Sequence, residues 1–126
     1  MNESGKIDGV DAELHGVFQV RQVTRGTALE SLVGADLVRV EAAQTSSTHR
    51  HNRAETVLFF TAGSGEVLLH AHREVVAVTT GDRVVIPAGT FHAVRTSIEA
   101  VEFMSVQSPP ILDLSTGVLD LEPLEE

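Results

Sequence analysis

The sequence predicts an all-β fold, a sandwich or barrel of short antiparallel strands. Most of its length divides into segments that are rich in Val, Ile, Phe and Thr, and several of them alternate apolar with polar residues. Turn signals that contain glycine or proline separate these segments at intervals of about ten residues, a spacing typical of sandwiches and barrels. No internal repeat of the length found in solenoids or propellers is present.

The expected elements follow one another along the chain. The strands are Leu14–Val20, Ala35–Glu41, Thr45–His51, Thr56–Thr61, Glu66–His70, Glu74–Thr79, Arg83–Ile86, Phe91–Arg95 and Glu99–Val106. The turn signals between them are Gly26, Gly34, Ala62–Gly65, Thr80–Asp82 and Pro87–Gly89. Only Thr27–Val33 has the pattern of a short helix, which Gly34 would end.

Length and composition indicate one globular domain over residues 1–126. The chain has no linker-like stretch, and its 42% hydrophobic and 21% charged residues are near the globular average. Nine Lys and Arg against eighteen Asp and Glu give a net charge of −9. This balance argues against binding to nucleic acid or to an anionic membrane surface, because both need clustered positive charge.

Several targeting and redox features are missing from the sequence. Apolar runs such as Thr56–Ala62 are too short to span a membrane, and the polar segment Met1–Asp8 has no signal core. The chain has no cysteine, which excludes disulfides, zinc–thiolate sites and cysteine nucleophiles. We therefore expect a soluble cytoplasmic protein.

The C-terminal segment 108–126 differs from the expected barrel core, which covers about 35–107. From Ile111 onwards it carries five acidic residues and no basic one, together with seven aliphatic residues. A disordered tail would seldom hold so many aliphatic side chains, so we expect part of it to pack on the barrel or on a neighbouring subunit. The alternative is a frayed terminus.

The histidines indicate a metal site. His49 and His51 are two residues apart, so in an extended chain both imidazoles point the same way, and Glu55 shares their parity if no bulge intervenes. His92 follows the bend predicted at Pro87–Gly89. Three imidazoles and one carboxylate would suit Fe, Mn, Ni or Zn and leave about two positions open on a six-coordinate ion.

These residues lie in two motifs that resemble those of the cupin superfamily. The first places two His one residue apart, a Glu three or four residues on, and a Gly about six residues later; here it comprises His49, His51, Glu55 and Gly63. The family's leading Gly is Ala43 in this chain. The gap from Glu55 to Gly63 is one residue longer than usual. The alternative register puts Thr56 in the Glu place, which is chemically a poorer ligand. We therefore assign Glu55 and expect the extra residue in the hairpin near Thr61–Gly65.

The second motif runs from Gly81 through Pro87 and Gly89 to His92, with Thr96 where the family has Asn. With both motifs present in order, the resemblance implies a double-stranded β-helix, or jelly-roll, barrel formed by a single cupin domain. It also implies one divalent transition metal per subunit, held by His49, His51, Glu55 and His92.

The remaining candidates are expected to be structural. His70 and His72 form a second pair near a hairpin turn, where we expect a solvated surface rather than a second metal site. His15 stands alone in an early strand. Arg39 is a possible anchor for an anionic substrate, and Arg50 should point away from the metal, but both fit solvated surface arginines better.

Two functions remain open. The resemblance implies a metal-dependent enzyme acting on a small organic substrate, as a dioxygenase, isomerase or cyclase, and Glu55 could then act as a base. The alternative is a non-catalytic cupin that binds or senses a metal or a small ligand. Because short strands leave exposed sheet edges, we also expect a homodimer, with Leu14–Val20 and the segment after Pro110 as the candidate interface.

Overall fold

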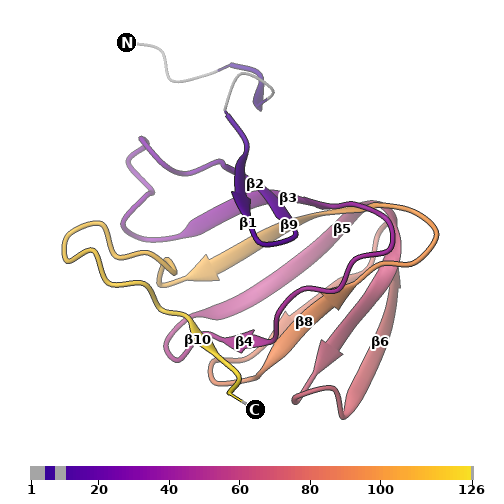
Figure 1. Cartoon of the computed structure of the whole chain (residues 1–126). Coiled ribbons are helices and arrows are strands. Elements are labelled where there is room, and N and C mark those ends of the chain that lie inside the picture. The colour runs from indigo at the N-terminus through magenta and orange to yellow at the C-terminus, as the bar shows by residue number, and fades with distance from the viewer. Residues whose placement is uncertain (1–4, 8–10, 126) are drawn as a thin grey trace.

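The computed structural model describes residues 5–7 and 11–125 and shows a curled sheet of antiparallel strands (Figure 1). The strands are β1 (Glu13–His15), β2 (Phe18–Gln22), β3 (Gly34–Val40), β4 (His49–Arg50), β5 (Glu55–Leu69), β6 (Glu74–Thr79), β7 (Arg83–Ile86), β8 (His92–Arg95), β9 (Val101–Ser108) and β10 (Glu122–Pro123). The all-β prediction is confirmed. No helix in the described ranges is long and apolar enough to cross a membrane. The segment Met1–Asp8, for which the sequence predicts no signal core, lies largely outside the described residues.

The long strand β5 connects the two halves of the sheet. The strand order is β1-β2-β3-β9-β5-β8-β4-β10, and β6 and β7 also pair with β5. The first half of β5 pairs with β7 and β9, whereas its second half pairs with β6 and β8. The sheet therefore curls about β5, which brings β4 and β8 round to one side of a shared interior (Figure 1).

The prediction of two strands joined by a turn at Ala62–Gly65 is wrong, because β5 continues through this segment. The glycines mark a bulge instead: the register with β9 shifts between Phe60 and Ala62. Gly63 has a φ of +76°, and a Cβ on it would collide with the carbonyl oxygen of Ala100. A glycine inside a strand often marks a bulge or a close backbone approach, and Gly63 does both.

Two further expectations near the N-terminus need correction. The segment predicted as one strand, Leu14–Val20, is a hairpin: β1 and β2 pair through a two-residue loop that begins at Gly16, whose φ is +62°. The predicted helix Thr27–Val33 is a series of turns. The Thr27 hydroxyl accepts the N–H of Leu29 at 3.2 Å, which competes with helical hydrogen bonding. Gly34 starts β3 rather than ending a helix.

The core lies between the two halves of the curled sheet. It consists of inward-facing aliphatic and aromatic side chains, among them Val40, Phe60, Val67, Val101 and Phe103. Phe60 is fully buried with its ring 5.1 Å from that of Phe103, whereas the neighbouring Phe59 is exposed. Strand alternation therefore places Phe60 inside and Phe59 outside.

The C-terminal segment packs on its own barrel. β10 pairs with β4 in the register Glu122↔Arg50, and the N–H of Leu124 donates to the carbonyl of Thr48 at 3.0 Å. In Figure 1 this segment, drawn in yellow, runs alongside β4. The expectation that the tail packs is confirmed, and it contacts the strand that carries the first histidine of the motif.

Candidate metal centre

The structure brings three of the four predicted ligands together. His49 in β4 lies directly opposite His92 in β8, and their ring centroids are 4.5 Å apart. His51 follows β4, with its ring centroid 5.0 Å from that of His49 and 5.2 Å from that of His92. One ring nitrogen from each residue lies within 4.8 Å of the others. We call His49, His51 and His92 the triad.

Backbone carbonyls orient the triad. The Nδ1–H of His51 donates to the carbonyl of Asp120 at 2.7 Å, and that of His92 donates to the carbonyl of Thr90 at 2.9 Å. His49 makes the same kind of bond to Ser47 at a longer 3.3 Å. A carbonyl oxygen can only accept, so we assign the proton to Nδ1 in each ring, which leaves Nε2 with a free lone pair. Metal-binding histidines are typically oriented in this way.

Burial keeps two members of the triad neutral. Desolvation, followed by the charge of His51, lowers the pKa of His49 to about 4. Desolvation and then the charge of His49 lower the pKa of His92 to about 3. At neutral pH both rings therefore carry lone pairs rather than a second proton, which is the protonation state that binds metal.

The fourth predicted ligand, Glu55, is not at the triad. Its side chain is exposed, whereas Thr56 is 3% exposed and lines the cavity beside the triad. The chain bends at Asn52 and Arg53, so strict alternation from His51 does not continue into β5. Thr56 rather than Glu55 therefore lines the cavity beside the triad.

The triad opens into a cavity of about 360 Å³, near the lower end of the range for small-molecule sites. We call it the triad cavity. Its wall is mainly apolar and includes Phe18, Leu58, Val94, Phe103 and Leu121. A site of this kind can hold a cation at the imidazoles and a small, largely apolar molecule next to it.

The C-terminal segment completes the site through Asp120. Its carboxylate accepts the backbone N–H groups of Asn52, Arg53 and Ala54 at 2.7 to 2.9 Å, while its carbonyl holds His51. Partial burial raises the pKa of Asp120, but these three donors outweigh it and the net pKa is lowered. The role of Asp120 cannot be predicted from local sequence, because its contacts are with residues that lie 66 to 69 positions earlier in the chain.

The two arginines singled out in the sequence, Arg39 and Arg50, form ion pairs and do not line the triad cavity. Arg39 pairs with Glu41 at 3.0 Å and Glu102 at 3.4 Å, so it does not serve as a substrate anchor. Arg50 pairs with Glu122 at 2.9 Å and lies over the ring of Phe91.

The other histidines lie outside the triad. His70 and His72 are exposed in the turn after β5, where His72 contacts the Thr48 hydroxyl at 2.8 Å. His15 is exposed at the cavity rim, 3.4 Å from Glu13.

Comparison with known proteins identifies the family. Residues 36–107 match the model of the cupin domain family, so the chain belongs to the cupins. Its fold is accordingly the predicted jelly-roll barrel. In a search of curated proteins, no sequence matches this chain.

Solved structures share the fold at low sequence identity. A variant of PAC13 from Streptomyces, with uridine, has a TM-score of 0.77 at 14% identity and covers 99% of this chain and 92% of its own. The polyketide cyclase RemF from Streptomyces resistomycificus has a TM-score of 0.75 at 19% identity over 87% and 81% of the two chains. Salicylate 1,2-dioxygenase from Pseudoaminobacter salicylatoxidans, with gentisate, has a TM-score of 0.73 at 16% identity over 94% of this chain and 32% of that one.

Proposed function

We propose that this cupin, as a single domain over residues 1–126, is a metal-dependent enzyme that acts on a small organic substrate. It would bind one divalent transition metal per subunit through His49, His51 and His92. The observation that carries the proposal is the convergence of three imidazoles, at least two of them neutral, on the wall of a cavity of small-molecule size.

The donor set narrows the choice of metal. Imidazole nitrogen suits Zn, Fe, Ni and Cu, whereas carboxylate oxygen favours Mn. Because Thr56 stands where the sequence predicted a carboxylate, we propose Zn, Fe or Ni rather than Mn. When bound, such an ion supplies a Lewis acid for a substrate oxygen. The protein's part is to hold the three rings through their Nδ1–H groups and to surround the substrate with apolar wall.

The folds of the compared proteins support three reaction classes without separating them. Solved structures with this fold include a dioxygenase, a polyketide cyclase and a protein named as a putative sugar phosphate isomerase. In each class a bound metal could polarise an oxygen atom of the substrate. One observation favours the alternative, a non-catalytic binding cupin: exposure of Glu55 leaves the triad without the base that the sequence predicted.

Turnover should depend on both the metal and the triad. Chelated protein would be reloaded separately with Zn²⁺, Fe²⁺ and Ni²⁺ and incubated with a hydroxybenzoate in air, an aromatic polyketide-like diketone and an aldose phosphate. Oxygen uptake and mass spectrometry of products are the readouts. We expect turnover of one class by one metal form, and none by His92→Ala. If the wild-type protein holds metal but converts none of the three substrate classes, the enzyme proposal fails and the proposal of a binding protein takes its place.

We also propose that the protein is cytoplasmic and forms a homodimer. The experiment below tests the dimer. β1 lies at the edge of the sheet and exposes 76% of Leu14, and Leu32 and Val118 are also largely exposed. Light scattering coupled to size exclusion should give twice the chain mass of 13.5 kDa, and Leu14→Asp should shift the protein towards monomer. A monomeric wild-type protein would contradict the dimer.

A further inference from the structure

A polar stripe crosses the wall of the triad cavity on three neighbouring strands. It consists of Asp36 on β3, Ser105 and Gln107 on β9, and Thr56 on β5. The register places Asp36 opposite Ser105 and Thr56 opposite Gln107, so the four side chains are adjacent. Two residues further along each strand the inward positions are apolar, and they are Val38, Phe103 and Leu58. The stripe is therefore a local interruption of a hydrophobic wall.

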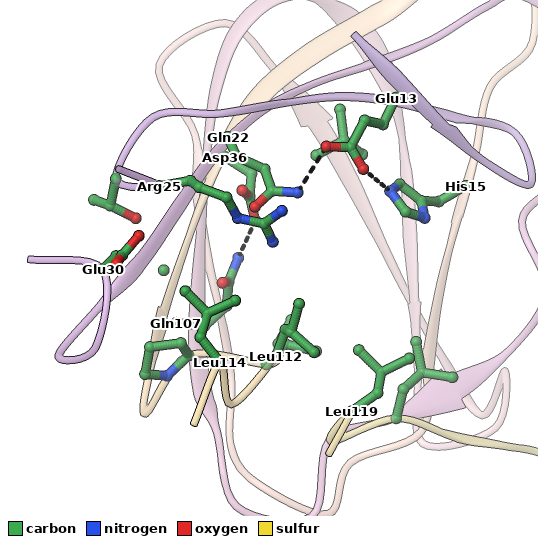
Figure 2. A pocket seen from close by; sticks show the side chains of 16 residues that line it. Glu13, His15, Gln22, Arg25, Glu30, Asp36, Gln107, Leu112, Leu114 and Leu119 are labelled. Carbon is green, nitrogen blue, oxygen red and sulfur yellow. Dashed lines mark hydrogen bonds and ion pairs between the residues drawn. The ribbon is translucent and has the colours of Figure 1, made fainter. Parts of the chain in front are cut away.

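One amide holds most of the stripe together. Nε2 of Gln107, a residue that is 2% exposed, lies 3.1 Å from the Asp36 carboxylate and 2.6 Å from the Ser105 hydroxyl oxygen. Burial raises the pKa of Asp36, while the hydrogen bond from Gln107 and the charge of Arg25 oppose that rise. Asp36 and Gln107 also line a second cavity, together with Arg25 and with Leu112, Leu114 and Leu119 of the C-terminal segment. Figure 2 shows this second cavity and the Gln107–Asp36 hydrogen bond in it.

Thr56 is the member of the stripe without an internal partner. Its Oγ1 is fully buried and, among the described residues, it is the buried side-chain polar atom that has no hydrogen bond. Leaving a hydroxyl unpaired inside a protein costs about 1–3 kcal/mol. Valine would fill the same volume without that cost. Thr56 lines the triad cavity, so a molecule bound there can supply the partner that the protein itself does not.

The chemistry of the stripe defines that partner. The Asp36 carboxylate is an acceptor, and a Thr hydroxyl can accept as well as donate, so the stripe suits the O–H group of a ligand. A ligand carboxylate would be repelled by Asp36 when that group is ionised. The rest of the wall is aliphatic and aromatic, with Phe18 and Phe103 facing the cavity. A cavity of about 360 Å³ has room for one small ring system.

We propose that the polar stripe recognises a hydroxyl group of a small hydroxylated aromatic ligand, which is bound between the stripe and the triad. The Thr56 hydroxyl and the Asp36 carboxylate make the specific hydrogen bonds. Thr56 is thus a ligand-recognition residue in the position where the sequence predicted a metal ligand. The inference rests on the proposed function in that both use the triad cavity.

Matched ligands and matched variants test this proposal. The ligands are phenol, resorcinol and phloroglucinol, each paired with its fully O-methylated ether, and binding is followed by saturation-transfer NMR and titration. Thr56→Val and Asp36→Asn alter the stripe, and Thr61→Val changes an exposed threonine of the same strand. We expect at least one phenol to bind more tightly than its ether. Thr56→Val should weaken that binding by about five- to tenfold, the value of one hydrogen bond, whereas Thr61→Val should not.

The stability of the variants gives an independent readout. Thr56→Val should be at least as stable as wild type, because it removes an unpaired buried hydroxyl, so weaker binding cannot be ascribed to unfolding. Equal binding by wild type and Thr56→Val, or no preference for any phenol over its ether, would overturn the proposal and leave a stripe that holds only water.

Metal content measured on the same samples separates the two proposals. Wild-type protein without metal would contradict the proposed function. The stripe would still be judged by the comparison of phenols with ethers in that metal-free protein.

Discussion

Alanine at His51 or His92 is expected to abolish metal binding while the barrel remains folded. Each residue contributes one of three ring nitrogens that lie within 4.8 Å of one another, and Glu55 is not placed to compensate. Loss of an outer-shell partner alone costs roughly 10–100-fold in metal affinity, so loss of a ligand should cost more than about 100-fold. Elemental analysis by plasma mass spectrometry and isothermal titration of Zn²⁺ measure this loss.

His70→Ala is the matched control for the triad variants. His70 is also a histidine near the end of a strand, but it is exposed and lies outside the triad. We expect wild-type metal content in this variant. If His70→Ala lost metal and His51→Ala and His92→Ala kept it, the binding site would be the second histidine pair and the account of the triad would fail.

Alanine at Asp120 should weaken both the fold and the metal site. The substitution removes an acceptor for three backbone N–H groups next to His51, which are left to compete for water. Hydrogen bonds to a charged group are worth about 1.5–3 kcal/mol each, but this carboxylate is partly solvated, so we expect a total loss of about 2 kcal/mol. Thermal unfolding should show a midpoint lowered by roughly 6 °C.

Asp120→Ala should also weaken metal binding. The carbonyl that accepts from His51 belongs to the same residue, so a displaced segment releases the ring. Affinity for Zn²⁺ should fall by roughly 10-fold or more, as expected for an outer-shell partner. Asp113→Ala is the control, because its carboxylate interacts with Ser115 and Thr116 of its own turn and not with the segment around His51. Equal zinc affinity in wild type and Asp120→Ala would show that the tail does not position His51.

Local sequence pattern was sufficient to predict most of the barrel. Alternation and turn residues located β3, β6, β7, β8 and β9 to within a few residues. These patterns failed where a glycine could indicate either a turn or a bulge. The local sequence predicts a turn at Gly63, which instead forms a bulge in a continuous strand, as the register shift with β9 and the close approach of Ala100 show.

The candidate site was predictable as far as residue spacing determines it. His49, His51 and His92 were identified from two motifs, and the structure places them together. Ligand chemistry favours Glu55, whereas the gap of six residues between Thr56 and Gly63 fits the spacing of the motif better. The bend at Asn52 and Arg53 determines which of the two side chains faces the cavity. The carboxylate of Asp120 accepts the N–H groups of both bend residues. A contact of that sequence separation leaves no periodic signal.

X-ray absorption spectroscopy of the protein with its bound metal can decide whether all three histidines coordinate the ion. It reports how many imidazole nitrogens surround the ion and at what distance. A three-histidine site should give three imidazoles per metal, at about 2.0–2.1 Å if the ion is zinc, with any remaining positions filled by oxygen donors such as water and with no change in Glu55→Gln. A spectrum with fewer than three imidazoles, or one altered by Glu55→Gln, would contradict the three-histidine site.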